Sequence, residues 1–445
     1  MRSTPARLFG TDGVRGRVGI DLTEDVVRDV GAAFGAVLIE RQQTAHVLLA
    51  RDTRVSGPLL AAAVEDGLLG AGVRVTDCGV MTTPGLCLLT RHLGAAGGIV
   101  VSASHNPPDF NGIKLVGGDG EKLPDALQER IERLARDHAL RADPATEGVL
   151  EQRSGDFDGW YIDTLLGHTQ GGVGLDGLRI CVDCAHGAAY ECGPEALRRA
   201  GATIVPMNDS PDGDLINVES GSLHPQRLAE YVRAEKADLG IAFDGDADRA
   251  VFVDGAGSVC DGDHTKYLLA ADMLDRGLLQ PKMVIGTVMS NLGLERALRA
   301  IGVELLRTPV GDRSVIAEMK RTGAQVGGEQ SGHIIFPDLG LGDGIYTALR
   351  VCEVVARNGK SLAELAAPVV KCPQLLFNIA VTNGYDWHAN HRLVQALAEW
   401  QERLGDTGRI LIRPSGTEPL LRIMVEAQEA DTARAAADAL AALVP

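Results

Sequence analysis

The 445-residue chain contains only eight cysteines and has no long hydrophobic run. The cysteines are scattered, mostly within apolar stretches, which is typical of reduced, buried thiols and not of a disulfide framework. Cys181 and Cys184 have CxxC spacing, but no second CxxC completes a zinc site, so we expect both to pack in a core. No apolar run reaches membrane-spanning length, and the first residues, MRSTPARLFG, contain no apolar signal core. We therefore expect a cytoplasmic protein that does not bind membranes.

The chain also lacks any block of Lys and Arg. Its net charge is −17 at pH 7, so binding to nucleic acid or to a membrane surface is not expected. Nucleotide-binding signatures are missing too, because there is no Walker A sequence. Gly172, Gly174 and Gly177 match GxGxxG, but they precede a strand-like segment when they should follow one. An anionic substrate stays compatible with this composition if arginines gather locally.

What the chain does contain is a regular alternation of helix-like and strand-like segments. Apolar residues recur at helical spacing over 24–41 and 57–69, and short apolar runs at 46–50 and 99–101 are typical of buried strands. This rhythm predicts mostly parallel, doubly wound α/β sheets, and the length requires several cores. We predict three similar doubly wound α/β domains and a C-terminal α+β domain, at residues 1–153, 154–257, 258–371 and 372–445, with a polar linker over 141–155.

The first chemically informative stretch is GGIVVSASHNPPDFNGIK, residues 97–114. Its β-branched run ends in a loop that contains Ser104, His105 and two prolines, which cannot continue a central strand. Ligands bind at the carboxyl ends of strands in open α/β sheets, so Ser104 is a candidate nucleophile. A serine hydroxyl needs help from a base, a metal or a nearby charge. Taken alone, the loop is better interpreted as a polar turn.

The second informative stretch is DGDADR, which directly follows the apolar strand LGIAF. Asp244, Asp246 and Asp248 occupy alternate positions and project to one side, where they repel one another unless a cation neutralises them. An EF-hand is excluded because Arg249 and Gly255 stand where Gly and Glu are required. The pattern favours Mg²⁺ with open positions for water or phosphate. A solvated acidic turn is the alternative interpretation.

Three further loops present groups that can bind a polyol or a phosphate. LFGTDGVRG (8–16) carries Arg15, which could clamp a phosphate; GGEQSGH (327–333) carries hydrogen-bonding groups suited to a sugar; RPSGTEP (413–419) is a plausible phosphate nest. Turn formation explains each loop about as well. The candidate residues of the last two loops are Glu329, Ser331, His333, Arg413, Ser415, Gly416 and Thr417, together with the following Arg422.

Together, the four motifs SASHNP, DGDADR, GGEQSGH and RPSGTEP resemble the phosphoserine, metal, sugar and phosphate loops of the α-D-phosphohexomutase family over essentially the whole chain. The resemblance implies a heart-shaped, four-domain phosphosugar isomerase with a central active-site cleft, often a homodimer. LFGTDGVRG, TVMSNLGL, GSLHP and Gln330 are most similar to bacterial members that interconvert glucosamine 6-phosphate and glucosamine 1-phosphate for UDP-N-acetylglucosamine and peptidoglycan precursor synthesis. The alternatives are a phosphomannomutase/phosphoglucomutase, a metal-assisted phosphohydrolase and a catalytically silent phosphosugar-binding regulator.

The resemblance also implies roles for individual residues. Ser104 would carry a phosphoryl group and, with the three aspartates, contact one Mg²⁺ per subunit; glucosamine 1,6-bisphosphate would be intermediate and activator. Lys114, His105 and Arg249 are the candidates for the proton shuttle, and Lys114 and Arg249 could equally stabilise charge. Glu329 and Ser331 would fix the sugar ring, with His333 beside them. The 413–417 loop would hold the phosphate that is not reacting.

Overall fold

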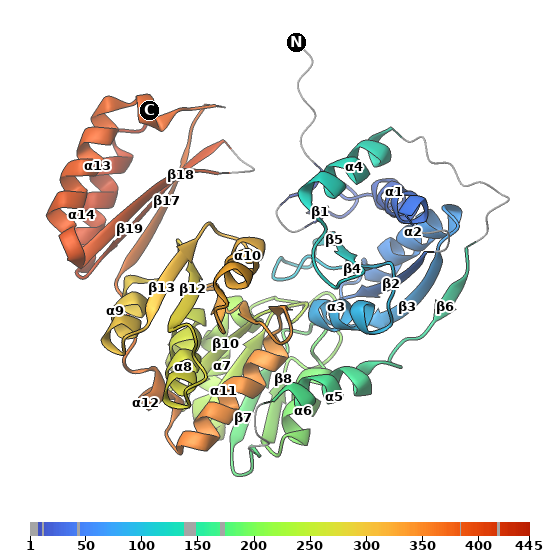
Figure 1. Cartoon of the computed structure of the whole chain (residues 1–445), viewed down its shortest axis with the longest axis horizontal. Coiled ribbons are helices and arrows are strands. Elements are labelled where there is room, and N and C mark those ends of the chain that lie inside the picture. The colour runs from blue at the N-terminus through green and yellow to red at the C-terminus, as the bar shows by residue number, and fades with distance from the viewer. Residues whose placement is uncertain are drawn as a thin grey trace.

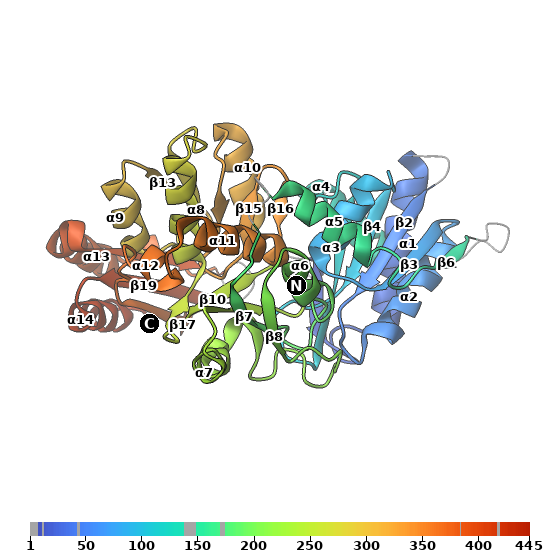
Figure 2. The ribbon, with the colours of Figure 1, turned by 90° about the horizontal axis from the view of Figure 1, so that it is seen from below.

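The computed structural model describes residues 8–10, 13–41, 45–137, 148–169, 174–382, 384–415 and 419–445. These residues form four separate sheets, which Figure 1 shows as an arc of four units with the N-terminal unit at one end and the C-terminal unit at the other. Figure 2 shows the same succession from below. Among the described residues, no helix is both long and apolar enough to cross a bilayer. All eight cysteines are buried and free, as predicted.

The first unit is a six-stranded sheet with helices on both faces. Its strand order is β1-β5-β4-β2-β3-β6. Val47 and Leu49 of the central strand pack in one apolar cluster with α1 and α2, whereas Leu48 and Ala50 pack in another with α3. This burial on both faces explains the continuous apolar run. The elements are β1 (Val14–Arg17), α1 (Glu24–Arg41), β2 (His46–Arg51), α2 (Gly57–Gly70), β3 (Arg74–Val80), α3 (Thr83–His92), β4 (Gly97–Val101), β5 (Phe110–Gly117), α4 (Asp125–Arg136) and β6 (Leu150–Gln152).

The second unit is a five-stranded sheet in the order β11-β10-β9-β7-β8. The elements are α5 (Asp158–His168), β7 (Arg179–Asp183), α6 (Cys192–Arg199), β8 (Thr203–Met207), the 3-10 turn η1 (Gly221–Leu223), α7 (Pro225–Glu235), β9 (Leu239–Phe243), β10 (Ala250–Asp254) and β11 (Val259–Cys260).

The third unit is also five-stranded, in the order β13-β12-β14-β15-β16, and it shares one continuous apolar core with the second unit. Its elements are α8 (Gly262–Asp275), β12 (Met283–Thr287), α9 (Leu292–Ala300), β13 (Glu304–Thr308), α10 (Asp312–Thr322), β14 (Gly327–Gly328), β15 (Ile334–Phe336), β16 (Leu341–Gly342), α11 (Gly344–Asn358) and α12 (Leu362–Ala366).

Each of these three sheets is mixed: some neighbouring strands run parallel and the others antiparallel. The prediction of mostly parallel sheets holds for the first, where three of five pairings are parallel. It is wrong for the second and third sheets, which have two parallel and two antiparallel pairings each. The cause is connection length, because a short loop can return a strand only antiparallel, whereas a parallel return needs a long crossover. The predicted linker also contains β6, which pairs with β3.

The fourth unit is a three-stranded antiparallel sheet in the order β17-β19-β18, packed on two helices. This confirms the predicted change to an α+β unit. Arg409 ties the sheet to the third unit, donating to the carbonyls of Val288 at 2.9 Å and Ser290 at 2.6 Å. The elements are β17 (Gln374–Ala380), the 3-10 turn η2 (Trp387–Ala389), α13 (His391–Leu404), the 3-10 turn η3 (Gly405–Thr407), β18 (Gly408–Pro414), β19 (Leu420–Ala427) and α14 (Ala430–Ala441).

Candidate active site

All four polar loops predicted from the sequence connect antiparallel neighbours in their sheets. Residues 102–109 join β4 to β5, 244–249 join β9 to β10, 329–333 join β14 to β15, and 415–419 join β18 to β19. Each hairpin return therefore presents its polar residues at one edge of a sheet. The structure brings the first three loops together; of the fourth it describes only the flanking residues, which make no hydrogen bond or ion pair with the first three units.

Ser104 lies directly against the acidic loop of the second unit. Its side chain is buried, and its Oγ donates a hydrogen bond to Oδ2 of Asp244 at 2.7 Å. Nδ1 of His105 lies 3.2 Å from the same hydroxyl. The Ser104 backbone is left-handed, with φ of 52°, a conformation that non-glycine residues adopt only when their surroundings hold them there.

Asp244, Asp246 and Asp248 form a compact cluster of carboxylates. One oxygen from each lies within 4.8 Å of the other two. Oδ1 of Asp246 and Oδ1 of Asp248 are buried and make no hydrogen bond. Burial and repulsion by the other two carboxylates raise the pKa of Asp244 to about 8. Clustered buried carboxylate oxygens that make no hydrogen bond are suitable ligands for a hard divalent cation, so the cluster fits Mg²⁺.

Several cationic side chains surround the aspartate cluster. Nζ of Lys114, on β5, donates to Asp246 Oδ2 at 2.6 Å and lies 3.6 Å from Asp248 Oδ2. Nε of Arg249 lies 3.6 Å from Asp248 Oδ1. Burial, and then the charges of Arg249 and Arg15, lower the pKa of His105 to about 4. These contacts place Lys114, His105 and Arg249 beside Ser104 and the aspartate cluster, and the charge of Arg15 acts on His105.

The 329–333 loop lies against the same cluster from the third unit. The Ala250 amide donates to the Gly332 carbonyl at 3.2 Å and fixes the loop on β10. Nδ1 of His333 lies 3.7 Å from Asp248 Oδ1; although burial opposes it, the charges of Asp248, Asp312 and Glu329 raise the pKa of His333 to about 9. Oγ of Ser331 is buried and makes no hydrogen bond. The loop therefore holds polar groups that a ligand can satisfy.

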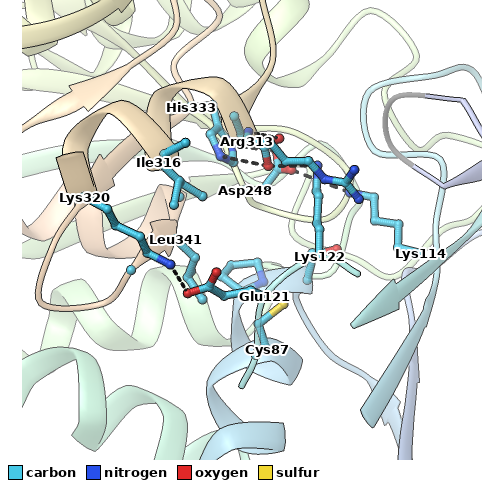
Figure 3. Close-up of a pocket in the computed structure, with 17 residues that line it drawn as sticks. Cys87, Lys114, Glu121, Lys122, Asp248, Arg313, Ile316, Lys320, His333 and Leu341 are labelled. Atoms are coloured by element: carbon cyan, nitrogen blue, oxygen red, sulfur yellow. Dashed lines mark hydrogen bonds and ion pairs between the residues drawn. The ribbon is translucent and has the colours of Figure 1, made fainter. Parts of the chain in front are cut away.

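A cavity of about 220 Å³ lies between the first and third units beside Asp248 (Figure 3). Lys114, Asp248 and His333 line its wall next to the aspartate cluster. Ion pairs between the units border it: Lys122 with Asp312 at 2.8 Å, and Lys320 with Glu121 at 2.5 Å. The cavity gives a small ligand room next to the carboxylates.

The fourth loop lies apart from the other three. Arg413 and Arg422 stand opposite one another on β18 and β19, and Arg422 Nη2 donates to Ser415 Oγ at 3.3 Å. Burial and the charge of Arg422 lower the pKa of Arg413. Within the described part of the chain, no hydrogen bond or ion pair joins Arg413 or Ser415 to the first three units. Gly416 and Thr417 lie outside the described residues.

Sequence reasoning missed three residues that contact these loops. The Thr83 hydroxyl, at the start of α3, donates to Asp246 Oδ2. Arg54 and Asn217 both donate to backbone carbonyls of the Ser104 loop. The sequence did contain an indication of Arg54: the charged run RDTR directly follows the apolar strand at 46–50. Charged residues at the end of a buried strand usually have partners that neutralise them. Nothing in the sequence indicated Asn217.

Comparisons with known proteins cover all four units. Family models described as phosphoglucomutase/phosphomannomutase match residues 6–141 (domain I), 161–257 (domain II), 261–372 (domain III) and 376–443 (C-terminal domain). The chain is 46% identical over 422 residues to the phosphoglucosamine mutase of Pelotomaculum thermopropionicum, covering 94% of each chain. It is 46% identical over 442 residues to the phosphoglucosamine mutase of Saccharopolyspora erythraea, covering 99% of each chain.

A solved structure gives the same result. The fold matches that of a phosphoglucomutase/phosphomannomutase family protein from Burkholderia thailandensis with a TM-score of 0.82 and 28% identity, covering 98% of this chain and 97% of that one. The conserved architecture and the clustered loops agree with the resemblance that the motifs predicted. The chain therefore belongs to the phosphoglucomutase/phosphomannomutase family, the α-D-phosphohexomutases.

Proposed function

We propose that the chain is a phosphoglucosamine mutase that interconverts glucosamine 6-phosphate and glucosamine 1-phosphate through a phosphoserine at position 104. The observation that carries this proposal is the 2.7 Å contact between the Ser104 hydroxyl and Asp244, which puts a buried serine at a cation-binding cluster. Relatives that carry this name span nearly the whole chain at 43–46% identity and support the amino-sugar substrate. The product would feed UDP-N-acetylglucosamine and peptidoglycan precursor synthesis.

The proposed reaction is two phosphoryl transfers in opposite directions. With glucosamine 6-phosphate, the O1 hydroxyl of the sugar attacks the phosphorus on Ser104; the P–Oγ bond breaks, a P–O1 bond forms, and the hydroxyl proton passes to a base. The resulting glucosamine 1,6-bisphosphate turns over within the site. Ser104 Oγ, which takes up a proton after the first transfer, then loses it to the base and attacks the phosphorus on O6; the P–O6 bond breaks, a P–Oγ bond forms, and O6 takes up a proton as glucosamine 1-phosphate forms.

Asp244, Asp246, Asp248 and the Ser104 side chain would hold the Mg²⁺. When bound, the ion supplies a positive charge that stabilises the charge on the transferring group. Lys114 donates to Asp246 and lies close to Asp248, and therefore limits the repulsion among the carboxylates. Positioning and charge stabilisation account for most of the catalysis in phosphoryl transfer, so this cluster is the centre of the proposed mechanism.

Three side chains stand near enough to move the proton. Nδ1 of His105 is 3.2 Å from Ser104 Oγ, and Lys114 and Arg249 lie beside the aspartate cluster. General acid–base transfer requires hydrogen-bond reach of the reacting oxygen, which His105 has in this structure. Lys114 and Arg249 can equally stabilise charge, and Arg15 contacts the phosphate in this proposal.

Substrate recognition is divided between the third and fourth units. Glu329 and Ser331 bind the hydroxyl and amino groups of the ring in both of its orientations, and His333 stands beside them. Ser331 Oγ supports this assignment because it is buried without a hydrogen bond. The phosphate that is not reacting is held by the groups around the last hairpin: Arg413, Ser415, Gly416, Thr417 and Arg422.

The test is phosphorus NMR of the purified protein with Mg²⁺ and each of glucosamine 6-phosphate, glucose 6-phosphate and mannose 6-phosphate, plus a trace of the matching bisphosphate. The proposal expects the 1-phosphate isomer in each case and the highest kcat/KM for the amino sugar. Leaving a buried polar group unpaired costs about 1–3 kcal/mol, so a preference of about 10- to 100-fold is expected. A higher kcat/KM for glucose or mannose phosphate makes the chain a phosphomannomutase/phosphoglucomutase; inorganic phosphate makes it a phosphohydrolase, and binding without turnover a regulator.

Three further expectations stay predictions: a homodimer, a cytoplasmic location and the domain boundaries at residues 153, 257 and 371. Light scattering of the purified protein measures the first, and cell fractionation the second. Limited proteolysis measures the third, because cleavage concentrates at exposed links between domains.

A further inference from the structure

Arg54 has an unusual place for an arginine. Its side chain is completely buried in the loop that follows β2, and its guanidinium makes five hydrogen bonds that use all of its N–H groups. Nε donates to Asp52 Oδ2 at 3.0 Å. The other four bonds go to backbone carbonyls: three in the Ser104 loop, of Ser104 (3.0 Å), Asn106 (2.7 Å) and Pro107, and one at the start of β5, of Phe110 (2.9 Å).

Asp52 continues this contact to the other side of Ser104. Its Oδ2 accepts a hydrogen bond from Ser102 Oγ at 2.6 Å, and Ser102 Oγ accepts one from the Ser104 amide at 2.9 Å. The Ser104 peptide groups are thus held at both ends by one buried ion pair, Arg54 with Asp52. A serine keeps a left-handed backbone conformation only where the surrounding contacts hold it there. The hydrogen bonds with Arg54 and, through Ser102, with Asp52 are such contacts.

Asn217 adds a tie from the second unit, which also carries the aspartate cluster. Its Nδ2 donates to the carbonyls of Ser104 at 2.8 Å and Asn106 at 3.0 Å, two of the acceptors that Arg54 uses. Asn217 is itself left-handed, with φ of 59°, and nearly buried. Because it bridges the two units at the Ser104 carbonyl, it sets the loop against Asp244.

From these contacts we infer that Arg54 and Asn217 are positioning residues, which hold the Ser104 loop in the left-handed conformation that aims Oγ at the aspartate cluster. The inference rests on the proposed function of Ser104 as the phosphoryl carrier. Neither side chain touches the hydroxyl or the carboxylates of the cluster; both act through backbone carbonyls. A lysine at position 54 cannot reproduce the array, since its ammonium has three N–H groups and no planar fork.

The experiment compares Arg54→Lys and Asn217→Ala with the wild type and with Val64→Ala. Val64 is fully buried on α2 of the same unit and away from the loop, so it controls for loss of stability alone. The measurements are the thermal midpoint, kcat and KM for glucosamine 6-phosphate, and the rate at which glucosamine 1,6-bisphosphate phosphorylates Ser104, followed by intact mass.

We expect both loop variants to lower kcat and the Ser104 phosphorylation rate together, by about ten-fold or more, with KM within about two-fold of the wild type, because displacement of a reacting atom affects the transition state more than binding. Val64→Ala should lower the thermal midpoint and leave kcat unchanged. If Arg54→Lys does not fold, Asn217→Ala decides alone.

Two results overturn the inference: a folded Asn217→Ala protein with normal kcat, or a loss of kcat that Val64→Ala reproduces at an equal loss of thermal midpoint. A third result is separate. If wild-type Ser104 takes up no phosphate, the proposed function fails, and the positioning role fails with it. Normal phosphorylation of both the wild type and the variants rejects only the positioning role.

Discussion

At the scale of single residues, the site depends on the burial of Ser104 and on its hydroxyl pointing at Asp244. Spacing in the sequence made Ser104 and the three aspartates candidates, and the resemblance to a known family implied their roles and those of the nearby cations. It did not indicate the left-handed backbone of Ser104 or the five bonds of Arg54, since both depend on carbonyls that only the folded loop brings together. Side chains that act through backbone contacts leave little trace in a sequence.

Replacing the serine tests the nucleophile. We expect Ser104→Ala to lower turnover by about 1000-fold or more, since no other hydroxyl donates to Asp244 in the described structure. The fold should persist, because the change removes one small polar group. Intact mass should show one phosphate on the wild type and none on the variant, with Ser258→Ala, an exposed serine between β10 and β11, as a control that keeps the phosphate site. Near-normal turnover in phosphate-free Ser104→Ala protein contradicts the assignment.

Removing the metal tests the aspartate cluster. EDTA should abolish turnover and added Mg²⁺ should restore it, because the unpartnered oxygens of Asp246 and Asp248 are suited to a hard cation. Asp246→Asn should weaken Mg²⁺ binding, measured by calorimetry, since it removes a ligand charge. Asp238→Asn, on the far side of the second unit beside Arg179, serves as the charge control. Full activity in EDTA is incompatible with the metal role.

At the scale of elements, the site is built from hairpin returns. The strands expected at 46–50, 99–101 and 239–243 agree with β2, β4 and β9 within two residues, but the sheets were expected to be mostly parallel. Apolar periodicity reports whether a strand is buried and not the direction of its partner, so it could not show that the loops at 102–109 and 244–249 turn the chain straight back. The same limit hid β6, which is only three residues long.

Close packing between two of these returns gives a prediction at Gly245. A Cβ there would lie 2.5 Å from the Ser104 carbonyl oxygen and 2.9 Å from Asn217 Nδ2, so the two loops would have to separate. We expect Gly245→Ala to lower kcat by about 10- to 100-fold, since small displacements of reacting groups have effects of that size. Gly167→Ala on α5, where a Cβ meets nothing within 4 Å, is the matched control and should be neutral. Normal kcat for Gly245→Ala contradicts the close approach.

Helix α2 gives a prediction about pH. Burial, followed by the charges of Asp77 and Asp66, raises the pKa of Glu65 from 4.5 to about 7. Between these values the folded protein binds more protons than the unfolded chain, so this residue makes the free energy of unfolding fall as pH rises from 4.5 to 7. Glu65→Gln should remove that loss and raise the thermal midpoint relative to wild type at pH 8 but not at pH 4. The exposed Glu402→Gln should show no such crossover; an equal response of both variants refutes the assignment.

At the scale of the whole molecule, the loops of the first three units already surround one site, whereas Arg413 and Ser415 lie on a separate unit (Figure 1). The sequence could predict one loop per unit but not this spacing, because the arrangement of units is set by contacts such as those of Arg409 with Val288 and Ser290. The fourth unit has an apolar core separate from that of the second and third units, and polar contacts such as the 2.8 Å bond from the Leu292 amide to Glu426 Oε1 join them. Domains joined in this way are expected to move relative to one another.

We therefore expect substrate binding to move the fourth unit toward the loops of the first three units. We expect glucosamine 1,6-bisphosphate to reduce the radius of gyration of Ser104→Ala protein, measured by small-angle X-ray scattering, because Arg413 and Arg422 gain a phosphate to bind. Adding Arg413→Met to this protein should abolish the reduction, and Arg413→Met alone, with Ser104 intact, should raise KM about ten-fold or more. Arg392→Met, exposed on α13 of the same unit, should leave it intact. An unchanged radius in Ser104→Ala protein at saturating bisphosphate means that the site forms without closure.

The distance between the last hairpin and Ser104 also bears on how the enzyme stays primed. In the proposed reaction, the bisphosphate intermediate leaves Arg413 when it turns, and at that moment only the first three units would retain it. Each escape would leave Ser104 without its phosphate and the enzyme idle until another bisphosphate arrives. Motion of the fourth unit would then set a balance between turning the intermediate quickly and losing it, and a stiffer link to Ser290 would trade speed for retention.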